Sequence, residues 1–449
     1  MNFKKSQFLF LIPLTDRYYV LYNTLNSAVA LIDEEVKECL EKDTYSKIPS
    51  DILKCLEEEE FLIPEDLDEI KYYQFLVNKA IYSTDILSFV ILTTYDCNFS
   101  CIYCYEKAGG MIAPINMDIE TAQKVTAYIK RRIEITNPDI LSIALYGGEP
   151  LLNIDPGLLI LDNMKRFSLQ NGIELKCGLI TNGSLMTKEK IVKLLECNLT
   201  SIQVTIDGTE EVHNNRRPFK DGKGSFSLIM KNVIDAIDII PSKTIVIRSN
   251  IDRMNYNDYP LFLDYLASVG LKNKIKIGIG VPRGVFPYCM RMQFSEKEIA
   301  DRVFELWKIA LKKGFEYHIE PSSTLCSAMQ ENSLLIDPVG DLYKCWGLVG
   351  KKTFVVGSIY EEKYKPIFYE FITRSPLISQ KCRLCNILPY CNGACLYEAY
   401  WKTGSPFNII CSEVFGKEAL EKILKLYVMD RYKSLLKEKG LYEELIDGR

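Results

Sequence analysis

The stretch SFVILTTYDCNFSCIYC, residues 88–104, joins an apolar strand to a loop with three closely spaced cysteines. Ser88–Thr94 is a short run of apolar and β-branched residues, which is typical of a buried strand. Cys97, Cys101 and Cys104 follow it with the spacing CxxxCxxC. Three thiolates can hold three irons of a [4Fe–4S] cube and leave the fourth iron open to another ligand. The stretch therefore predicts a strand that ends in an iron–sulfur site.

Apolar strands alternate with amphipathic helices through residues 83–315, which predicts an α/β fold with a parallel sheet. Six βα units indicate a partial (β/α)6 TIM-type barrel. Ligands of such sheets gather at the carboxyl ends of the strands, where every motif described below falls. The expected strands are Ser88–Thr94, Leu141–Tyr146, Leu175–Thr181, Ser201–Ile206, Thr244–Asn250 and Lys274–Val281.

The composition limits the classes of function. Lys and Arg number 55 against 59 Asp and Glu, a balance that argues against a nucleic-acid surface. We find no signal peptide and no apolar run long enough for a bilayer, so a cytoplasmic protein without a membrane partner is expected. Fifteen cysteines then point to metal or redox chemistry rather than disulfides. With two histidines, His213 and His318, a His-rich metal site is nearly excluded.

The cysteine loop, with Tyr103 before its last cysteine, resembles the signature of the radical S-adenosylmethionine (SAM) superfamily. The resemblance implies that the open iron binds SAM, that the cofactor yields a 5′-deoxyadenosyl radical, and that Tyr103 lies against the adenine. The alternative is a zinc knuckle, which would need a fourth ligand that no nearby His or Cys supplies.

Further motifs lie at later strand ends. Tyr146-Gly147-Gly148-Glu149-Pro150 resembles the family's GGEP motif, which receives the methionine ammonium, although alone it could be a turn. Asn182 follows the third strand, and Thr205-Ile206-Asp207-Gly208 after the fourth resembles the family's SxDG segment, with Thr205 keeping a hydroxyl. Arg248 or Asn250 could meet the cofactor carboxylate, and Arg216 and Arg217 compete for that role.

Residues from about 316 to Cys411 are predicted to form loops, and a single final helix is expected over Ser412–Lys439. Seven more cysteines form an ordered series in residues 316–449. Their spacing resembles the SPASM domain, which carries two auxiliary [4Fe–4S] clusters, so three clusters are expected in all. The resemblance assigns Cys326, Cys345 and Cys395 to an inner cluster and Cys382, Cys385, Cys391 and Cys411 to an outer one. The inner set lacks a fourth thiolate unless Cys289 supplies it, and an open iron there could take a substrate thiolate. A zinc ribbon is the alternative.

Residues 1–82 are predicted to form strands at Phe8–Ile12, Tyr18–Tyr22 and Ala28–Ile32 and helices at Asp33–Lys42 and Ser50–Glu59, with Ser50 as a cap. This winged-helix-like unit resembles the recognition element of enzymes that mature ribosomally made peptides. The resemblance implies that a leader peptide adds a strand to its exposed edge. A plain cap on the barrel is the alternative reading.

These resemblances predict an oxidoreductase that modifies a precursor peptide, with Cys97, Cys101, Cys104 and Cys345 as catalytic residues. A Cys thioether crosslink is the expected product, and a carbon–carbon crosslink or formylglycine of the anaerobic sulfatase-maturase type are alternatives. Sulfatase maturases resemble one another in an Asp after the second SPASM cysteine, where this chain has Trp346. A non-catalytic electron carrier would not need the cysteine loop or Gly147–Pro150. Flavodoxin or ferredoxin is the expected electron donor.

Overall fold

The computed structural model describes residues 3–104, 114–282, 287–317, 321, 324–412 and 416–447, and its largest element is a nine-stranded sheet. The strand order is β11-β10-β9-β8-β7-β6-β12-β13-β14, parallel from β11 to β12 and antiparallel beyond. All six predicted strands are present, each within two residues of its expected bounds: β6 Ile86–Thr94, β7 Ile140–Gly147, β8 Glu174–Thr181, β9 Leu199–Thr205, β10 Ile245–Asn250 and β11 Lys276–Gly280.

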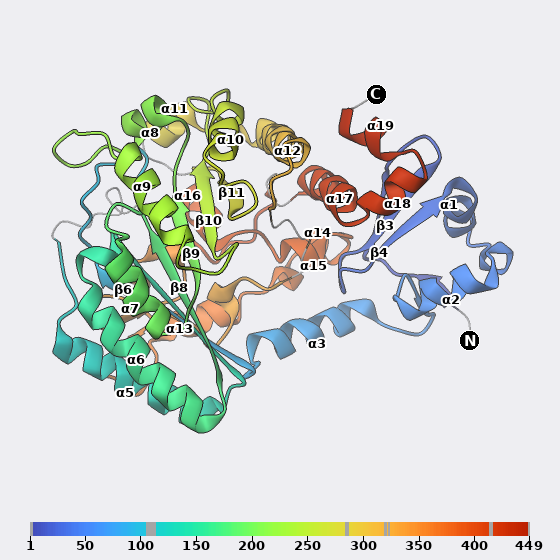
Figure 1. The fold of residues 1–449 in the computed structure, drawn as a ribbon. Helices are drawn as coiled ribbons and strands as arrows, with labels where there is room; N and C mark the ends of the chain where they lie inside the picture. Colours follow the sequence, from blue (N-terminus) through green and yellow to red (C-terminus); the bar gives the residue numbers. More distant parts are fainter. Residues whose placement is uncertain are drawn as a thin grey trace.

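The helices that follow these strands cover the outer face of the sheet, as α5, α6 and α7 do in Figure 1. Strand β7 shows why, because its side chains alternate between two environments. Leu141, Ile143 and Leu145 are fully buried on one face, whereas Tyr146 on the other face is half-buried. The helices are α5 Ile119–Thr136, α6 Ile154–Asn171, α7 Lys188–Glu196, α8 Glu210–Arg216, α9 Phe226–Ile237, α10 Tyr259–Ser268, α11 Pro287–Met292 and α12 Glu296–Lys312.

The C-terminal region is more regular than the sequence predicted. Instead of loops from about residue 316, a strand β12 (Ser333–Ile336) pairs in parallel with β6 and extends the main sheet. Short strands and helices follow it: β13 Asp341–Tyr343, β14 Gly357–Ser358, α13 Pro366–Ile372, α14 Gln380–Arg383, α15 Leu388–Cys391 and α16 Leu396–Thr403. Such short elements carry too few residues to show a hydrophobic period, so the sequence pattern missed them.

The single helix expected over Ser412–Lys439 is also wrong. The structure has α17 (Lys417–Arg431), α18 (Lys433–Glu438) and α19 (Tyr442–Asp447), with the chain leaving the helical path at Tyr432. A continuous apolar period runs through both helices, so the pattern alone could not locate the break.

The N-terminal unit has the predicted core of a three-stranded sheet and two helices. The sheet is β2 Leu9–Pro13, β3 Tyr18–Asn23 and β4 Val29–Asp33, and the helices are α1 Glu34–Glu41 and α2 Ser50–Glu58. Ser50 is not the cap of α2, since Pro49 occupies that position without a side-chain bond. Three elements were not predicted: β1 Phe3–Lys5, its partner β5 Leu62–Pro64, and α3 Glu69–Ile81, which leads to the barrel.

The C-terminal helices pack against the N-terminal unit. In Figure 1 the C-terminal helices α17 and α18 lie beside β3, and the ammonium of Lys439 lies over the ring of Tyr18. One face of the N-terminal sheet joins the main core, while the other packs on α1 and α2 through residues such as Leu21 and Ile32. The N-terminal unit is thus enclosed between its own helices and the C-terminal ones.

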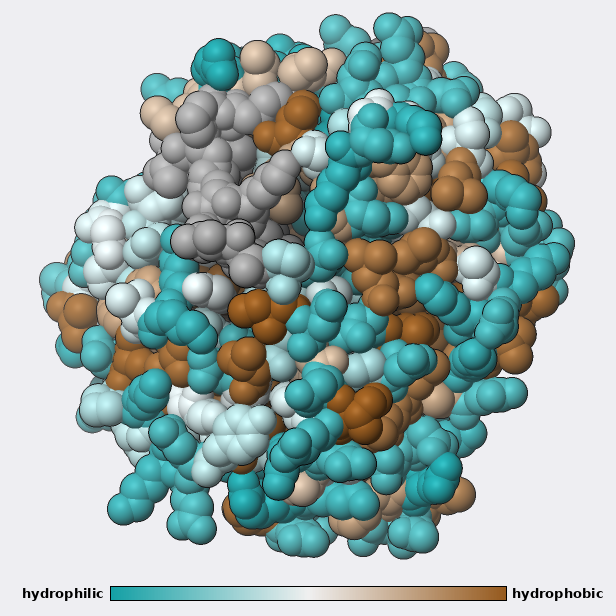
Figure 2. Space-filling model, turned by 90° about the vertical axis from the view of Figure 1, so that its left-hand side faces the viewer, coloured by the Kyte–Doolittle hydropathy of each residue, from teal (hydrophilic) through white to brown (hydrophobic). Residues whose placement is uncertain are grey.

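No helix in the described ranges is long and apolar enough to cross a membrane. Figure 2 shows one face of the molecule, on which apolar patches are interrupted by polar side chains. Exposed apolar side chains among polar ones are usual on protein surfaces.

Candidate active site at the strand ends

A cavity of about 760 Å³ lies at the carboxyl ends of the parallel strands. Its lining combines the cysteine loop, the glycines that end β7, and residues from β8 to β10. Residues of the C-terminal region complete the wall. Lining residues predicted from the sequence are Cys97, Cys101, Tyr103, Cys104, Gly147, Gly148, Asn182, Thr205, Arg248, Asn250, Trp346 and Cys395.

The cysteine loop has the features of an iron–sulfur ligand loop. The N–H of Phe99 donates to the sulfur of Cys97 over 3.4 Å, the kind of bond that stabilises a cluster thiolate. Burial raises the pKa of Cys97 to about 12, and it also raises the pKa of Cys101. Thiols this buried ionise when a metal binds them. Cys104 lines the same cavity, so the thiols of the loop fit the predicted cluster.

The two glycines of the GGEP motif are needed because the backbone at the end of β6 and just after it lies too close for a side chain at either position. A Cβ on Gly147, whose φ is +131°, would collide with the carbonyl oxygen of Thr94 at the end of β6. A Cβ on Gly148 would collide with the carbonyl of Asp96 in the same way. Glycine therefore lets β7 end directly against the segment that carries the cysteines.

Glu149 points into the protein, where its carboxylate is fully buried. It accepts hydrogen bonds from the Leu151 N–H (3.0 Å), the Thr181 hydroxyl (2.8 Å) and the Asn182 N–H (2.7 Å). Burial raises its pKa, whereas the three donors favour its charged form. Glu149 thus fixes the ends of β7 and β8, and a carboxylate keeps acceptor capacity beyond three bonds.

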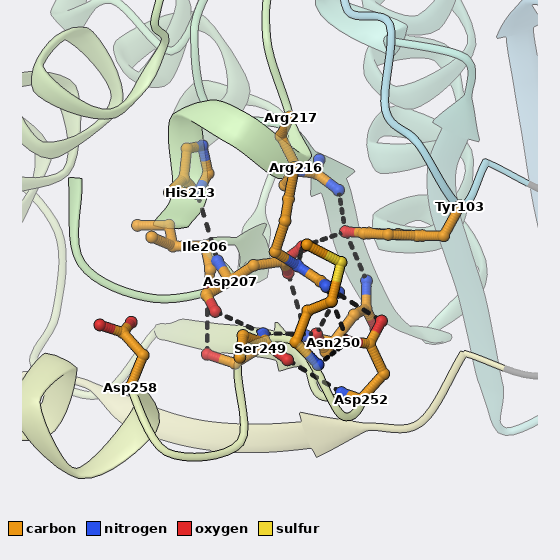
Figure 3. Close-up of polar contacts among 12 residues, drawn as sticks. Tyr103, Ile206, Asp207, His213, Arg216, Arg217, Ser249, Asn250, Asp252 and Asp258 are labelled. Atoms are coloured by element: carbon orange, nitrogen blue, oxygen red, sulfur yellow. Dashed lines mark hydrogen bonds and ion pairs between the residues drawn. The ribbon is translucent and has the colours of Figure 1, made fainter. Parts of the chain in front are cut away.

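Tyr103 is held by three polar partners from neighbouring strand ends (Figure 3). Its hydroxyl donates to Asp207 (2.5 Å) and accepts from Arg217 (2.7 Å) and Asn250 (3.1 Å). The side chain of Asp207 in turn accepts from the N–H of Asn250. The loop after β6 is thereby tied to the segment after β9 and to the end of β10.

The structure separates the two adjacent arginines. Arg216 is 1% exposed and pairs with Asp207 (3.2 Å) and with both carboxylate oxygens of Asp252 (2.9 Å each), so it is a structural residue. Arg217 lines the cavity, and its buried Nε has no hydrogen-bond partner in the described ranges. Arg217 is therefore a stronger candidate for the cofactor carboxylate than sequence reasoning made it, beside Arg248.

His213 supports this network through the backbone of Asp207. Its Nδ1 accepts from the N–H of Asp207 (3.2 Å), and its Nε2 lies 3.0 Å from the hydroxyl of Ser225. Because Nδ1 accepts, Nε2 carries the proton of the neutral ring. Burial lowers the pKa of His213 to about 3, so it is neutral and structural, not a metal ligand of the cavity.

The C-terminal cysteines fall into two groups. Cys326, Cys345 and Cys395 interact electrostatically with one another. Each precedes the first turn of a helix, and backbone N–H groups donate to the sulfurs of Cys326 and Cys345. Such turns favour thiolates. Cys391 interacts with Cys385 and Cys382 instead, so this grouping parallels the predicted inner and outer sets.

In the described part of the chain, no three His, Cys, Asp or Glu side chains converge on a point suited to one metal ion. Each thiolate of a [4Fe–4S] cube binds a separate iron, so the thiolates need not converge on one point. The features that suit these cysteines to clusters are therefore their arrangement in two groups and the backbone N–H groups that donate to their sulfurs. Cys411 is exposed, and the side chain of Cys289 lies outside the described residues.

Comparison with protein families places the cavity in context. The model of the radical SAM superfamily matches residues 91–282, which contain the cysteine loop and the six strands β6 to β11 apart from the start of β6. Residues 91–282 therefore belong to the radical SAM superfamily. Enzymes of that superfamily use SAM and a [4Fe–4S] cluster, and the cavity lies where such cofactors are expected.

Curated relatives share about a quarter of their residues with this chain. The radical SAM cyclopropyl synthase TigE of Paramaledivibacter caminithermalis is 23% identical, over 96% of this chain and 97% of the relative. A cysteine-type anaerobic sulfatase-maturating enzyme of Clostridium novyi is 24% identical, over 70% of this chain and 90% of its own. The mycofactocin maturase MftC of Mycolicibacterium smegmatis is 24% identical, over 73% of this chain and 83% of the relative.

Solved structures share the fold. The Streptococcus suis enzyme SuiB, bound to the precursor peptide SuiA, matches with a TM-score of 0.56 and 15% identity, over 92% of this chain and 99% of that one. The sulfatase maturase anSMEcpe with bound SAM matches with a TM-score of 0.58 and 16% identity, over 78% and 99%.

Several lining residues were not predicted. Glu398, Tyr397 and Trp401 project from α16 into the cavity. The Glu398 carboxylate is buried and bonds to Lys402 (2.8 Å) and Ser412 (2.8 Å). Their position two to six residues after Cys395, on one helix, was the available signal.

Proposed function

We propose that this enzyme modifies a ribosomally made precursor peptide and most readily forms a thioether at a peptide cysteine. One observation carries the proposal: a single cavity is lined by the cysteine loop and by Cys395, Trp346 and Gly347 of the C-terminal unit. A peptide in this cavity would meet the radical source on one wall and the proposed inner cluster on another.

The chemistry balances without an oxidant other than SAM. SAM bound at the cysteine loop supplies a radical that takes one hydrogen atom from a peptide carbon. The peptide thiol would lose its proton and one electron as its sulfur bonds to the carbon. Cys326, Cys345 and Cys395 and, separately, Cys382, Cys385, Cys391 and Cys411 would hold the auxiliary clusters that take up that electron. The peptide therefore loses two hydrogens, and flavodoxin or ferredoxin exchanges electrons with the enzyme.

Position 346 argues against formylglycine formation. The residue after the second SPASM cysteine does line the cavity, but it is Trp346, whose ring packs on Tyr146 with centroids 5.0 Å apart. An indole cannot accept the proton that a carboxylate at this position would take. The match to the sulfatase-maturating enzyme also covers only 70% of this chain.

A carbon–carbon product is the second candidate, because the match to TigE, a cyclopropyl synthase by name, covers nearly the whole chain. The two products have the same mass, since each loses two hydrogens. They differ in free thiols, because a thioether consumes one and a carbon–carbon bond consumes none.

The experiment is to look for a short cysteine-containing reading frame beside the gene and to coexpress its peptide with the enzyme, followed by mass spectrometry and thiol alkylation. We expect two hydrogens fewer per crosslink and one alkylated cysteine fewer. Cys345→Ala should abolish the crosslink and leave uncoupled SAM cleavage, whereas Cys55→Ala, at an exposed cysteine on α2, should change neither. An unchanged peptide mass would defeat the proposal.

We further propose that the leader peptide pairs with β4. The other edge strand, β2, is covered, since the Asn386 side chain donates to the Leu9 carbonyl (2.8 Å). The N–H of Asn23 donates to the Ala28 carbonyl, so along β4 the alternate residues Val29 and Leu31 direct their N–H and C=O groups away from β3. These groups suit an added strand.

Leu31 offers a sharp test of this edge. Leu31→Pro removes an outward N–H at a position where an edge strand tolerates proline. Leu31→Ala removes the side chain but keeps the N–H. We expect a labelled leader peptide to lose most of its affinity for Leu31→Pro, measured by fluorescence anisotropy, and much less for Leu31→Ala. Equal affinities for both variants would place the leader elsewhere.

A further inference from the structure

The five residues Cys391–Cys395 join the two proposed auxiliary clusters through an unusual backbone. Asn392, Gly393 and Ala394 have φ values of +47°, +80° and +68°, three left-handed residues in succession. Glycine adopts this conformation freely and Asn tolerates it, but an Ala is strained there. Contacts outside the loop must therefore hold it.

Most of those contacts come from Arg374, and the Tyr73 hydroxyl adds one by donating to the side-chain oxygen of Asn392 (2.8 Å). Its guanidinium donates to three successive carbonyls of the loop, those of Asn392 (3.2 Å), Gly393 (2.6 Å) and Ala394 (3.5 Å). It also donates to the Asn408 carbonyl (2.9 Å), three residues before Cys411. On its other side the loop presents the N–H groups of Gly393 and Ala394 to the sulfur of Cys391.

The charge of Arg374 lies among thiols of both groups. The side chain is 6% exposed, its Nε has no hydrogen-bond partner in the described ranges, and no described carboxylate forms an ion pair with it. The guanidinium interacts electrostatically with four thiols, which belong to Cys326, Cys391, Cys395 and Cys382. A buried cation is costly unless anions balance it, and thiolates of bound clusters would supply that charge.

We propose that Arg374 is a positioning residue between the two auxiliary clusters, which fixes the loop between their ligands and raises the reduction potentials of both. A fixed positive charge stabilises the reduced, more negative cluster, and charge near a cluster is one of the factors that set its potential. The inference rests on the proposed assignment of two clusters to these cysteines.

Lys344 provides a matched control because it approaches only one group. It is also buried, its ammonium donates to the carbonyls of Gln330 and Ser333 (2.7 Å to the latter), and it interacts with Cys326. Loss of this charge should affect the inner cluster alone.

The test uses the full-length chain with Cys97, Cys101 and Cys104 changed to Ala, so that only auxiliary clusters give signals. Iron content is measured first, and each cluster is then titrated anaerobically with detection by electron paramagnetic resonance. For Arg374→Met with full iron content, we expect both clusters to show a tenfold lower ratio of reduced to oxidised form at a given potential, which is 59 mV for one electron. Lys344→Met should shift one cluster only.

Arg374→Lys keeps the test decisive if the Met variant does not fold. This variant retains the charge but loses the fork of donors, so both potentials should stay within threefold of the parent ratio while thermal stability falls. A tenfold shift in Arg374→Lys, or unchanged potentials in iron-loaded Arg374→Met, would overturn the inference. A parent chain without auxiliary iron would instead show that the cluster assignment itself is wrong.

Discussion

Arg216 and Arg374 are both buried arginines, but different groups balance their charges. Arg216, at the strand ends of the barrel, pairs with the carboxylates of Asp207 and Asp252. Arg374, in the C-terminal unit, donates to backbone carbonyls and faces thiols. The protein alone completes the first site, whereas in the proposed cluster assignment the second would acquire its balancing charge from bound thiolates. The proposal therefore distinguishes a preformed site at the strand ends from a cluster-dependent C-terminal unit.

The largest effect should come from breaking the carboxylate-paired site. Arg216→Met leaves Asp207 and Asp252 buried without their partner, which typically costs about 3–5 kcal/mol. We expect anaerobic urea unfolding to show a loss of that size. Arg217→Met, one residue away, should destabilise the fold much less, and equal losses in the two variants would contradict the distinction between them.

Arg217→Met tests the part of this charge network that faces the cavity. Removing Arg217 takes away one charged donor without leaving a buried carboxylate, so Arg217→Met should fold. A hydrogen bond to a charged group contributes about 1.5–3 kcal/mol, so SAM affinity should fall roughly 10- to 100-fold. Equilibrium dialysis of the reconstituted enzyme with labelled SAM measures this, and unchanged affinity would move the carboxylate contact to Arg248.

His213→Gln should have the smallest effect, and it tests whether His213 stays neutral in the folded protein. Its pKa of about 3 lies below its ordinary value of 6.5, so the unfolded chain binds the extra proton between these values. Stability should therefore fall as pH decreases below 6.5, by up to about 1.4 kcal/mol per unit from this group. His213→Gln should flatten the dependence between pH 7.5 and 5.5, and identical slopes would show that the ring is not buried and neutral.

The barrel was predictable because its signals are local. Ser88–Thr94 is a strand on its own pattern, and the positions of Cys97, Gly147, Asn182 and Asn250 follow from the rule that parallel strands end at one edge. The charge network was not predictable, since Tyr103, Asp207 and Arg217 lie up to 114 residues apart and meet through tertiary folding.

The C-terminal unit illustrates the opposite case. The spacing of its cysteines indicated the unit, but not that β12 would extend the barrel sheet or that Arg374 would reach the loop after Cys391. Left-handed residues at Asn392 and Ala394 carry no clear sequence signal, because neither type requires that conformation. Short elements held by long-range contacts are invisible to periodicity.

Hydrogen transfer from the peptide tests the central claim most directly. The precursor peptide, deuterated at its carbon positions, is incubated anaerobically with the reconstituted enzyme, SAM and a reductant, and the 5′-deoxyadenosine is analysed by mass spectrometry. If the radical takes hydrogen from a peptide carbon, we expect deuterium in the 5′-deoxyadenosine together with a crosslinked peptide. Unlabelled 5′-deoxyadenosine beside an unaltered peptide would contradict it.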